Sequence, residues 1–376
     1  MKNRIIKNLG LSIVLSLVTV ECSSSSDDNT ESGIDGVKSV SFEIKPDTEL
    51  SAVATGTTLS GKKEYLVTRS RTASFDKAGQ MASVTIDQSV LYPGSILQGE
   101  SFMNGVYDPL VLSNPFKPVT LFFTCNGSYS AKKEGVLPKG SDILTAKNSL
   151  VRENASNIAT TYMPANYTFE SEQVTTEESF KKISSVHAKA NFLSIAKASF
   201  GYDKTTAWSN NKSYVVCKMK QTVYTAAIDP KYITDWIDGT ISASQCGLYE
   251  PVYISSVDYG RVAYIMIETS NSTSSVNSSI SASVSVAFKS FGGSVDYSTS
   301  TELKKLFDSK KVTVSILGGK SDVMVTDYKT FLDYMNPVQS NSLAYSAPVG
   351  YTVRRLKDNT TVPLATYYQD SYKEFR

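Results

Sequence analysis

Two segments of the chain alternate apolar and polar residues over strand-like distances, yet both also fit a helix. From residue 276 to 289 the even positions are mostly apolar and the odd positions mostly polar, which is the period of a strand with two unlike faces. The same stretch carries an apolar stripe at helical spacing, formed by Val276, Ile280, Val284 and Phe288. Residues 186–202 share this double pattern. We therefore predict that both segments can adopt either structure.

More regular strand patterns surround these two segments. Residues 38–90 alternate, with turns predicted at Thr55-Gly56, Ser60-Gly61 and Ala78-Gly79. Residues 119–124 have the composition of a buried strand, whereas 140–158 favour a helix that Ser141 or Asp142 would cap. Further strands are expected at 213–227, 251–269 and 310–319. The predicted chain is therefore mostly β-structure, with each ambivalent segment lying between two strands.

The composition agrees with this picture and narrows the function classes. The chain has 376 residues, of which 41% are hydrophobic and 22 are tyrosines, which is enough for two or three compact units with large cores. Abundant Ser, Thr, Val and Tyr favour strands. The net charge is only +2, so nothing indicates a nucleic-acid partner.

The first 22 residues have the features of an export signal. Lys2, Arg4 and Lys7 form a basic start, and the apolar run that follows is too short to span a membrane in the mature protein. The arrangement resembles a bacterial lipoprotein signal with Cys22 as the lipidated residue, although Glu21 stands where a small residue is usual. Residues 23–37 are expected to be a flexible tether. We expect either an outer-membrane surface lipoprotein or a secreted protein cut near this point.

Catalytic chemistry finds little support in the sequence. The single histidine, His187, has no cluster of cysteines or carboxylates at metal-ligand spacing, and no nucleophile elbow accompanies it. We therefore predict that the chain is not an enzyme and binds no cofactor or metal. Three cysteines remain after Cys22. They allow at most one disulfide, which the sequence does not assign, and they are Cys125, Cys217 and Cys246.

The ambivalent segments suit a membrane-spanning β-barrel. Each strand of such a barrel needs about 9–11 residues with one apolar and one polar face, and residues 180–212 and 270–305 can each form a hairpin of this kind. Stored as helices, the same residues could be packed in a water-soluble form. Serine-rich alternating strands in an ordinary β-sandwich are the competing interpretation. The residues predicted to face lipid are Val186, Ala188, Ala190, Phe192, Phe200, Tyr202, Val276, Ile280, Ala282, Val284, Val286 and Phe288.

An ordered set of short motifs links the chain to a known family. These motifs are LYPGSI at 91–96, KQTVYTAAIDP at 220–230, PVYISSVDYGRVAYIMIET at 251–269, LGG at 317–319 and APVGYTVRRLKDN at 347–359. In this order and spacing the chain resembles the cholesterol-dependent, or thiol-activated, cytolysins of the membrane attack complex/perforin superfamily. The resemblance runs from about residue 38 to the end, and it places both ambivalent segments where the family keeps its membrane-inserting helix clusters.

The resemblance implies a fold and a mechanism. It implies an elongated α+β fold with a bent central antiparallel sheet, two flanking helical clusters and an elongated β connector, with residues 38–376 as the cytolysin-like core. It also implies self-association into a ring in which each copy inserts two hairpins into a target membrane. Gly318 and Gly319 match the glycine pair at a bend of the central sheet, where backbone freedom permits a hinge.

One departure from the family pattern bears on partners. Family members continue into a domain with a tryptophan-rich cholesterol-binding loop, whereas this chain ends at YYQDSYKEFR and its tryptophans, Trp208 and Trp236, lie far apart upstream. We therefore expect a short cytolysin-like form that works with a longer membrane-binding partner. A surface-anchored binding or protective protein that no longer inserts stays open as the alternative, and Lys204, near the end of the first apolar row, would favour it.

Overall fold

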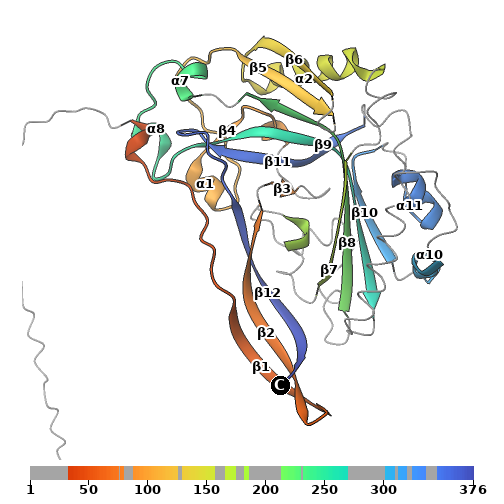
Figure 1. The fold of residues 1–376 in the computed structure, drawn as a ribbon. Coiled ribbons are helices and arrows are strands. Elements are labelled where there is room, and N and C mark those ends of the chain that lie inside the picture. The colour runs from red at the N-terminus through yellow and green to blue at the C-terminus, as the bar shows by residue number, and fades with distance from the viewer. Residues whose placement is uncertain are drawn as a thin grey trace, which may run out of the picture. The chain divides into compact units, whose positions relative to one another are not determined.

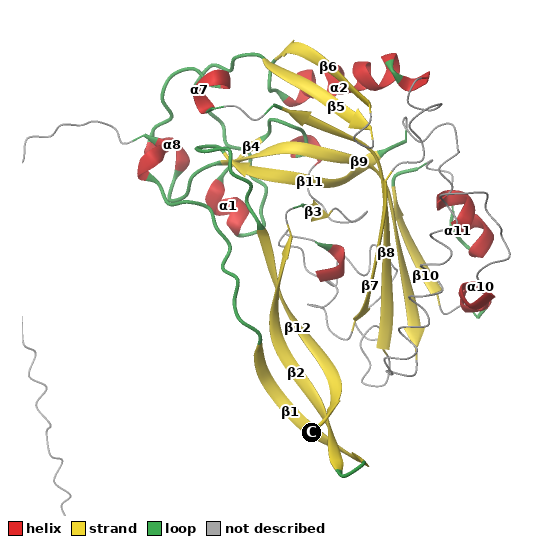
Figure 2. Ribbon diagram, viewed as in Figure 1, coloured by secondary structure: helices red, strands yellow, loops and turns green. Residues whose placement is uncertain are grey.

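The computed structural model describes most of the chain beyond residue 32, all of it in one compact unit, Ser32–Arg376. The described residues are 33–75, 77–79, 88–125, 129–156, 166–174, 182–185, 213–229, 232–269, 301–309, 312–319, 324–335 and 345–376. Strands dominate these residues and helices are short (Figures 1 and 2). The alternating patterns predicted mostly β-structure and the family resemblance implied the α+β class with a central antiparallel sheet; both are confirmed.

Two long strands, β8 (Ser213–Ile228) and β9 (Val252–Thr269), form the centre of a nine-stranded sheet. They pair with each other antiparallel along nearly their whole length. Their sequences are apolar on both sides, as expected for central strands covered on both faces. The strands expected at 213–227 and 251–269 are therefore confirmed, each to within about one residue.

The neighbours of β8 and β9 differ between the two halves of this sheet. In one half β8 pairs with β5 (Val119–Cys125), which pairs with β6 (Tyr129–Val136), and β9 pairs with β11 (Ala347–Arg355). Two short strands, β3 (Ala78–Gly79) and β4 (Ile96–Leu97), add to β11 and β9. In the other half β8 pairs with β7 (Asn166–Val174) and β9 with β10 (Val312–Leu317).

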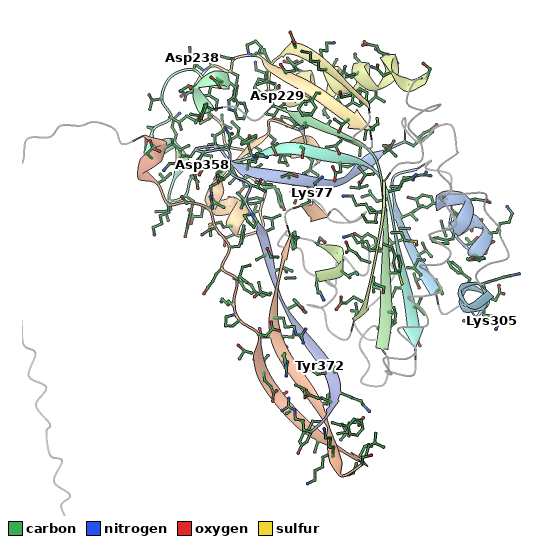
Figure 3. All side chains as sticks on the ribbon, viewed as in Figure 1. Lys77, Asp229, Asp238, Lys305, Asp358 and Tyr372 are labelled. Carbon is green, nitrogen blue, oxygen red and sulfur yellow. The ribbon has the colours of Figure 1, made fainter. Side chains whose placement is uncertain are left out.

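A separate three-stranded sheet joins the beginning of the described chain to its end. Its order is β1 (Thr48–Leu59), β2 (Lys62–Phe75) and β12 (Leu364–Phe375), all antiparallel. The strand β2 leads to β3 and β12 follows β11, so two connections link the sheets (Figure 1). The label on Tyr372 in Figure 3 marks this sheet.

Helices cover the nine-stranded sheet. The helix α2 (Gly140–Glu153) lies against β5 and β6, and α10 (Thr301–Asp308) and α11 (Tyr328–Met335) lie beside the half that contains β10 (Figure 1). Three short helices, α1 (Gly99–Met103), α7 (Ile233–Trp236) and α8 (Ala243–Cys246), lie at the opposite end of the sheet. No helix in the described part of the chain has the length and apolarity that a membrane span requires.

Several local predictions differ from the structure. Residues 40–47 form no strand, and strand β1 begins only at Thr48. Gly56 is not a turn: it has a φ of 85° inside β1, where the register with β2 shifts between Ala54 and Thr58. Gly79 belongs to β3, and α2 begins after Lys139 with no side-chain cap. The turn at Ser60-Gly61 is confirmed.

The described part of the chain begins at Gly33, within the segment predicted as a tether. Gly33 forms a β-bridge with Ser242, and Lys38 forms one with Tyr249. The carboxylate of Glu250 is fully buried and accepts a hydrogen bond from the Val40 amide at 3.0 Å. These contacts fasten residues 33–40 to the body of the unit, so the attachment begins before residue 38. Cys22 lies outside the described residues.

Candidate hinge at the bend of the central sheet

The central sheet turns where both long strands exchange their neighbours (Figure 1). On β9, the pairing with β11 ends at Gly260 and the pairing with β10 begins at Val262. On β8, the pairing with β7 ends at Thr222 and the pairing with β5 begins at Thr225, with a register shift against β9 between them. A bulge bends a strand and increases its twist, so this shared level is the bend.

Three glycines make the close backbone contacts at this level possible. A Cβ on Gly260 would overlap the carbonyl oxygen of Gln221, and one on Gly318 would overlap the carbonyl oxygen of Gly260. Gly318 and Gly319 have φ angles of 77° and 88°, in the left-handed region that glycine adopts without strain. A Cβ on Gly319 would lie 2.8 Å from the ring of Tyr334. The pair predicted from the sequence thus lies at the end of β10, against the bend.

Arg261 occupies the bend itself and is 4% exposed. Its Nε donates to Oε1 of Gln221 at 2.8 Å, and its Nη1 donates to the carbonyl oxygen of Tyr334 at 2.6 Å. The guanidinium also lies over the Tyr334 ring, 5.5 Å from its centroid. A buried arginine needs such partners because an unpaired charge in the interior is costly. Arg261 therefore fastens the end of α11 to the centre of the sheet.

Tyr334 closes the same cluster from the helix side. Its hydroxyl lies 3.0 Å from the carbonyl oxygen of Leu317 and 2.9 Å from that of Gly318. Burial raises the pKa of Tyr334, and Arg261 opposes this shift only in part. The hydroxyl therefore stays protonated and donates to the backbone carbonyls at the end of β10.

An apolar cluster holds β10 and α11 on this face of the sheet. Its buried members alternate along the two long strands and recur on α11; they are Val215, Cys217, Met219, Ala263, Ile265, Ile267, Tyr328, Phe331 and Tyr334. Val312, Val314 and Ile316 of β10 pack against it. The opposite face carries the alternate residues of the strands, including Tyr214, Val216, Tyr264 and Met266, which belong to the main core.

A buried carboxylate stands beside the bend. The carboxylate of Asp258 accepts three hydrogen bonds: from Nζ of Lys220 at 3.0 Å, from Nζ of Lys77 at 3.1 Å and from the hydroxyl of Thr225 at 2.7 Å. Burial raises the pKa of Asp258, but the two ammonium groups and the hydroxyl outweigh it, so the pKa lies below its usual value. Lys77, labelled in Figure 3, comes from the segment between the two sheets and so ties that segment to β9.

The structure brings together only some of the residues predicted from the sequence. Gly318 and Gly319 are at the bend, whereas all twelve predicted lipid-facing residues, from Val186 to Phe288, lie outside the described residues. Sequence reasoning missed Arg261 and Tyr334. The sequence held one signal for Arg261: it is a charged residue directly before the uncharged apolar run VAYIMI, residues 262–267.

In the described part of the chain, no group of three or more His, Cys, Asp or Glu side chains could hold a metal ion. Cys125, Cys217 and Cys246 are all buried free thiols. Burial raises the pKa of each, to about 11, about 12 and about 11, respectively.

Comparison with known proteins adds a family and a fold. A family model described as thiol-activated cytolysin matches residues 41–371. Tetanolysin of Clostridium tetani is 25% identical over 316 residues, which are 79% of this chain and 56% of tetanolysin. Perfringolysin O of Clostridium perfringens is 25% identical over 290 residues, 72% of this chain and 54% of its own length. The chain therefore spans about half the length of these curated relatives.

Solved structures share the architecture. The crystal structure of the human-specific toxin intermedilysin superposes with a TM-score of 0.60 at 20% identity, covering 91% of this chain and 74% of that one. A structure of pneumolysin gives a TM-score of 0.59 at 22% identity, covering 89% and 71%. At such identities the likeness establishes the fold alone.

Proposed function

Because the chain belongs to the thiol-activated cytolysin family, a family of pore-forming toxins, we propose that it forms pores by converting two linking segments into membrane-spanning hairpins. Family membership confirms the resemblance read from the motifs. The proposal rests on the level at which four strands of the central sheet end. All four strands of the half-sheet that contains β7 and β10 end at one level, and the two convertible segments link them in pairs.

The pairing of the strands defines that common level. Val174 at the end of β7 is opposite Tyr214, Ser213 is opposite Thr269, and Ile267 is opposite Val312. The link from β7 to β8 contains the predicted segment 180–212, and the link from β9 to β10 contains 270–305. Each link can therefore lengthen an antiparallel pair that already exists, and no new strand order is needed.

The register of the first pair matches the apolar pattern of its link. Val174 opposite Tyr214 keeps even-numbered residues opposite even-numbered ones when the ladder continues. The residues proposed to face lipid on both arms of this link are even-numbered. They are Val186, Ala188, Ala190 and Phe192 on one arm and Phe200 and Tyr202 on the other. A continued ladder would place them on one face.

In the second pair, β9 and β10, even-numbered residues are opposite odd-numbered ones, and the apolar residues of its link have the matching pattern. Ile267 opposite Val312 places even-numbered residues opposite odd-numbered ones. The outgoing arm has its apolar residues at even positions, namely Val276, Ile280, Ala282, Val284, Val286 and Phe288. The returning arm has them at odd positions, namely Val295, Tyr297 and Leu303. A one-residue slip would move a row to the other face, so this agreement is a specific support for the proposal.

The two hairpins would also end together. Continuing the first ladder centres its turn at Ser194, and continuing the second centres its turn at Lys289 and Ser290. Continuing the register between β8 and β9 aligns Ser194 with Phe288. From Val186 to Ser194 the outgoing arm has nine residues, and the returning arm from Ile195 to Tyr202 has eight, close to the roughly 9–11 that a tilted membrane strand needs. All four apolar rows would extend the face of Tyr214 and Met266.

The edges of the same half-sheet support the proposal that the chain assembles into a ring. In the described residues β7 pairs only with β8, so its other side is a free edge. On the far side the six residues of β10 cover β9. If β10 swings away at Gly318 and Gly319, β9 exposes an edge that β7 of a second copy can pair with. We propose that this hinge motion permits self-association.

The wider setting of the pore is also part of the proposal. We propose export of the chain with lipid on Cys22, which would keep it at the producing cell's surface, and cooperation with a longer cytolysin-like partner that binds the target membrane. The contacts of residues 33–40 with the body give such a tether a firm attachment point.

A probe scan tests the proposal. Single cysteines are placed from Val276 to Lys289 in a chain without Cys125, Cys217 and Cys246, each carries an environment-sensitive dye, and membranes are added with and without longer partners. We expect apolar signals at even-numbered positions and polar signals at odd-numbered ones. Cysteines at the exposed β1 positions Ala52, Val53 and Ala54 are controls that should not respond. If every scanned position keeps a helical pattern in all mixtures, the non-inserting binding or protective function replaces pore formation.

A further inference from the structure

A single helical turn at the start of the first link is packed firmly on the sheet. Ile183 and Ser184 of this turn, residues 182–185, are 4% and 1% exposed. The Ser185 amide donates to the Lys182 carbonyl oxygen at 3.0 Å, and Ser185 has a φ of 51°. The turn lies on the face of the sheet that carries Tyr214 and Tyr264. If the first link becomes a hairpin, this turn must leave the sheet.

Lys182, the first residue of the turn, connects it to strands β7 and β12. Its Nζ lies 2.7 Å from Oε1 of Glu172 on β7, and both side chains are about one-third exposed. The same ammonium lies 5.2 Å from the ring centroid of Tyr368 on β12. Lys182 thus joins the turn to an edge strand of the central sheet and to the three-stranded sheet.

Lys218 contacts the last residue of the turn from the underlying strand β8. It is on β8, directly opposite Glu170 of β7, and its side chain is only 7% exposed. Its Nζ lies 3.1 Å from the hydroxyl of Ser185 and 3.3 Å from Oε2 of Glu170. Burial lowers the pKa of Lys218, and Glu170 opposes that shift. A buried ammonium is tolerated only with such partners.

The two lysines reach alternate residues of one edge strand. Glu170 and Glu172 are two residues apart, so both side chains lie on the face that the turn covers. We propose that Glu170 and Glu172, together with Lys218 and Lys182, form a charge latch that holds turn 182–185 on the sheet and sets how readily the first link is released. The inference rests on the proposed function, since release matters only if the link converts.

The position of the latch has a consequence for assembly. Both glutamates belong to β7, which among the described strands pairs only with β8 and whose other side is where a second copy would pair. A strand added there acts on the residues that hold the turn. Self-association and release of the first link are thereby coupled through one strand.

Hydrogen exchange of the full chain in solution tests the latch without any membrane. Glu172→Gln removes one charge and keeps the shape of the side chain, and Lys182→Met removes the other. We expect amides in residues 183–185 to exchange about three- to tenfold faster in either variant, with no change in β9. Added salt should speed this exchange more in the unmodified chain than in the variants, which keep only the Lys218–Glu170 pair.

Two further variants keep the test decisive. Glu134→Gln breaks a Lys–Glu contact of the same 2.7 Å length on β6, with Lys132, and should leave the turn unchanged. The exchanged pair Lys182→Glu with Glu172→Lys should restore slow exchange. If Glu172→Gln and Lys182→Met both leave the exchange of 183–185 unchanged, the Lys182–Glu172 pair does not hold the turn and the four-residue latch is wrong.

The outcomes also separate this inference from the proposed function. Faster exchange in the latch variants without an alternating signal in the probe scan would retain the latch and reject pore formation. An alternating signal together with unchanged exchange would retain pore formation and reject the latch.

Discussion

The hydroxyl of Tyr334 donates to the carbonyl oxygen of Gly318, 2.9 Å away, and so joins the last turn of α11 to the end of β10. The carbonyl of Leu317 shares this hydroxyl at 3.0 Å. Tyr334 therefore adds a side-chain hydrogen bond to the strand pairing and apolar packing of β10, at the point where the proposed hinge lies.

Removing that hydroxyl should loosen β10 specifically. Tyr334→Phe leaves two backbone carbonyls without their partner, which we expect to cost about 1–2 kcal/mol of unfolding free energy and to speed exchange of β10 amides. Urea denaturation and hydrogen exchange measure both effects. Tyr367→Phe is the control: its hydroxyl also donates to a carbonyl, that of Glu43 at 2.8 Å, but the side chain is 43% exposed and water replaces the bond. Equal stability of the two variants would contradict the assigned role of Tyr334.

Gly318 should tolerate a methyl group far less than another glycine with the same backbone angle. Gly135 on β6 has a φ of 75°, against 77° for Gly318, but a Cβ there meets nothing within 4 Å. Gly135→Ala should cost only the strain, about 1–2 kcal/mol, whereas Gly318→Ala adds overlap with the Gly260 carbonyl, about 1–3 kcal/mol more. Unfolding midpoints of both variants give the difference, and indistinguishable midpoints would mean that the bend is not tightly packed.

Asp258 should make the unfolding free energy of the chain fall in acid. Because the pKa of Asp258 is lowered in the folded chain, its contribution is complete above about pH 4, the unfolded value, and is lost as the pH falls through the folded pKa. Asp258→Asn leaves Lys220, whose side chain is 16% exposed, without its carboxylate and should cost about 2–4 kcal/mol at pH 7. In denaturation from pH 7 to pH 2, the gap between the two proteins should narrow below pH 4. A gap that is constant across this range would show that the carboxylate is not ionised in the fold.

A disulfide between β9 and β10 should block assembly reversibly. Met266 and Thr313 are directly opposite each other, and a cystine there would prevent β10 from leaving the edge. With Met266→Cys and Thr313→Cys we expect no ring or membrane leakage when oxidised and recovery after reduction. The matched control pairs Thr68→Cys with Ser371→Cys in the three-stranded sheet, where the two hydroxyls lie 2.9 Å apart. Full activity of the oxidised β9–β10 variant would show that β10 stays in place during assembly.

The three described cysteines should resist thiol reagents in the folded chain. Burial raises the pKa of Cys217 to about 12 and those of Cys125 and Cys246 to about 11, so thiolate is scarce at pH 8 and access is blocked. With Cys22 replaced by serine, iodoacetamide should label the native chain at least tenfold more slowly than the chain in urea. Rapid labelling of native Cys217 would indicate that α11 opens frequently.

The sequence by itself determined the strands whose pattern is local. The runs at 119–124, 213–227, 251–269 and 310–319 are found as β5, β8, β9 and β10, and 140–158 contains α2. Period-two alternation and continuous β-branched runs reflect burial, which each segment carries in its own residues. Gly318 and Gly319 could also be singled out, but through the resemblance of the LGG motif to the family's glycine pair; the backbone freedom of glycine explains why such a pair suits a bend.

Only the tertiary structure decided which strands are neighbours and where the sheet bends. Arg261 meets Gln221 and Tyr334 across 40 and 73 residues of chain, and Lys218 meets Glu170 across 48. No local pattern encodes such pairings, because they arise when distant strands choose a common register. The failed turn at Gly56 has the same origin: a glycine with positive φ serves a bulge as well as a turn, and the neighbouring strand decides between them.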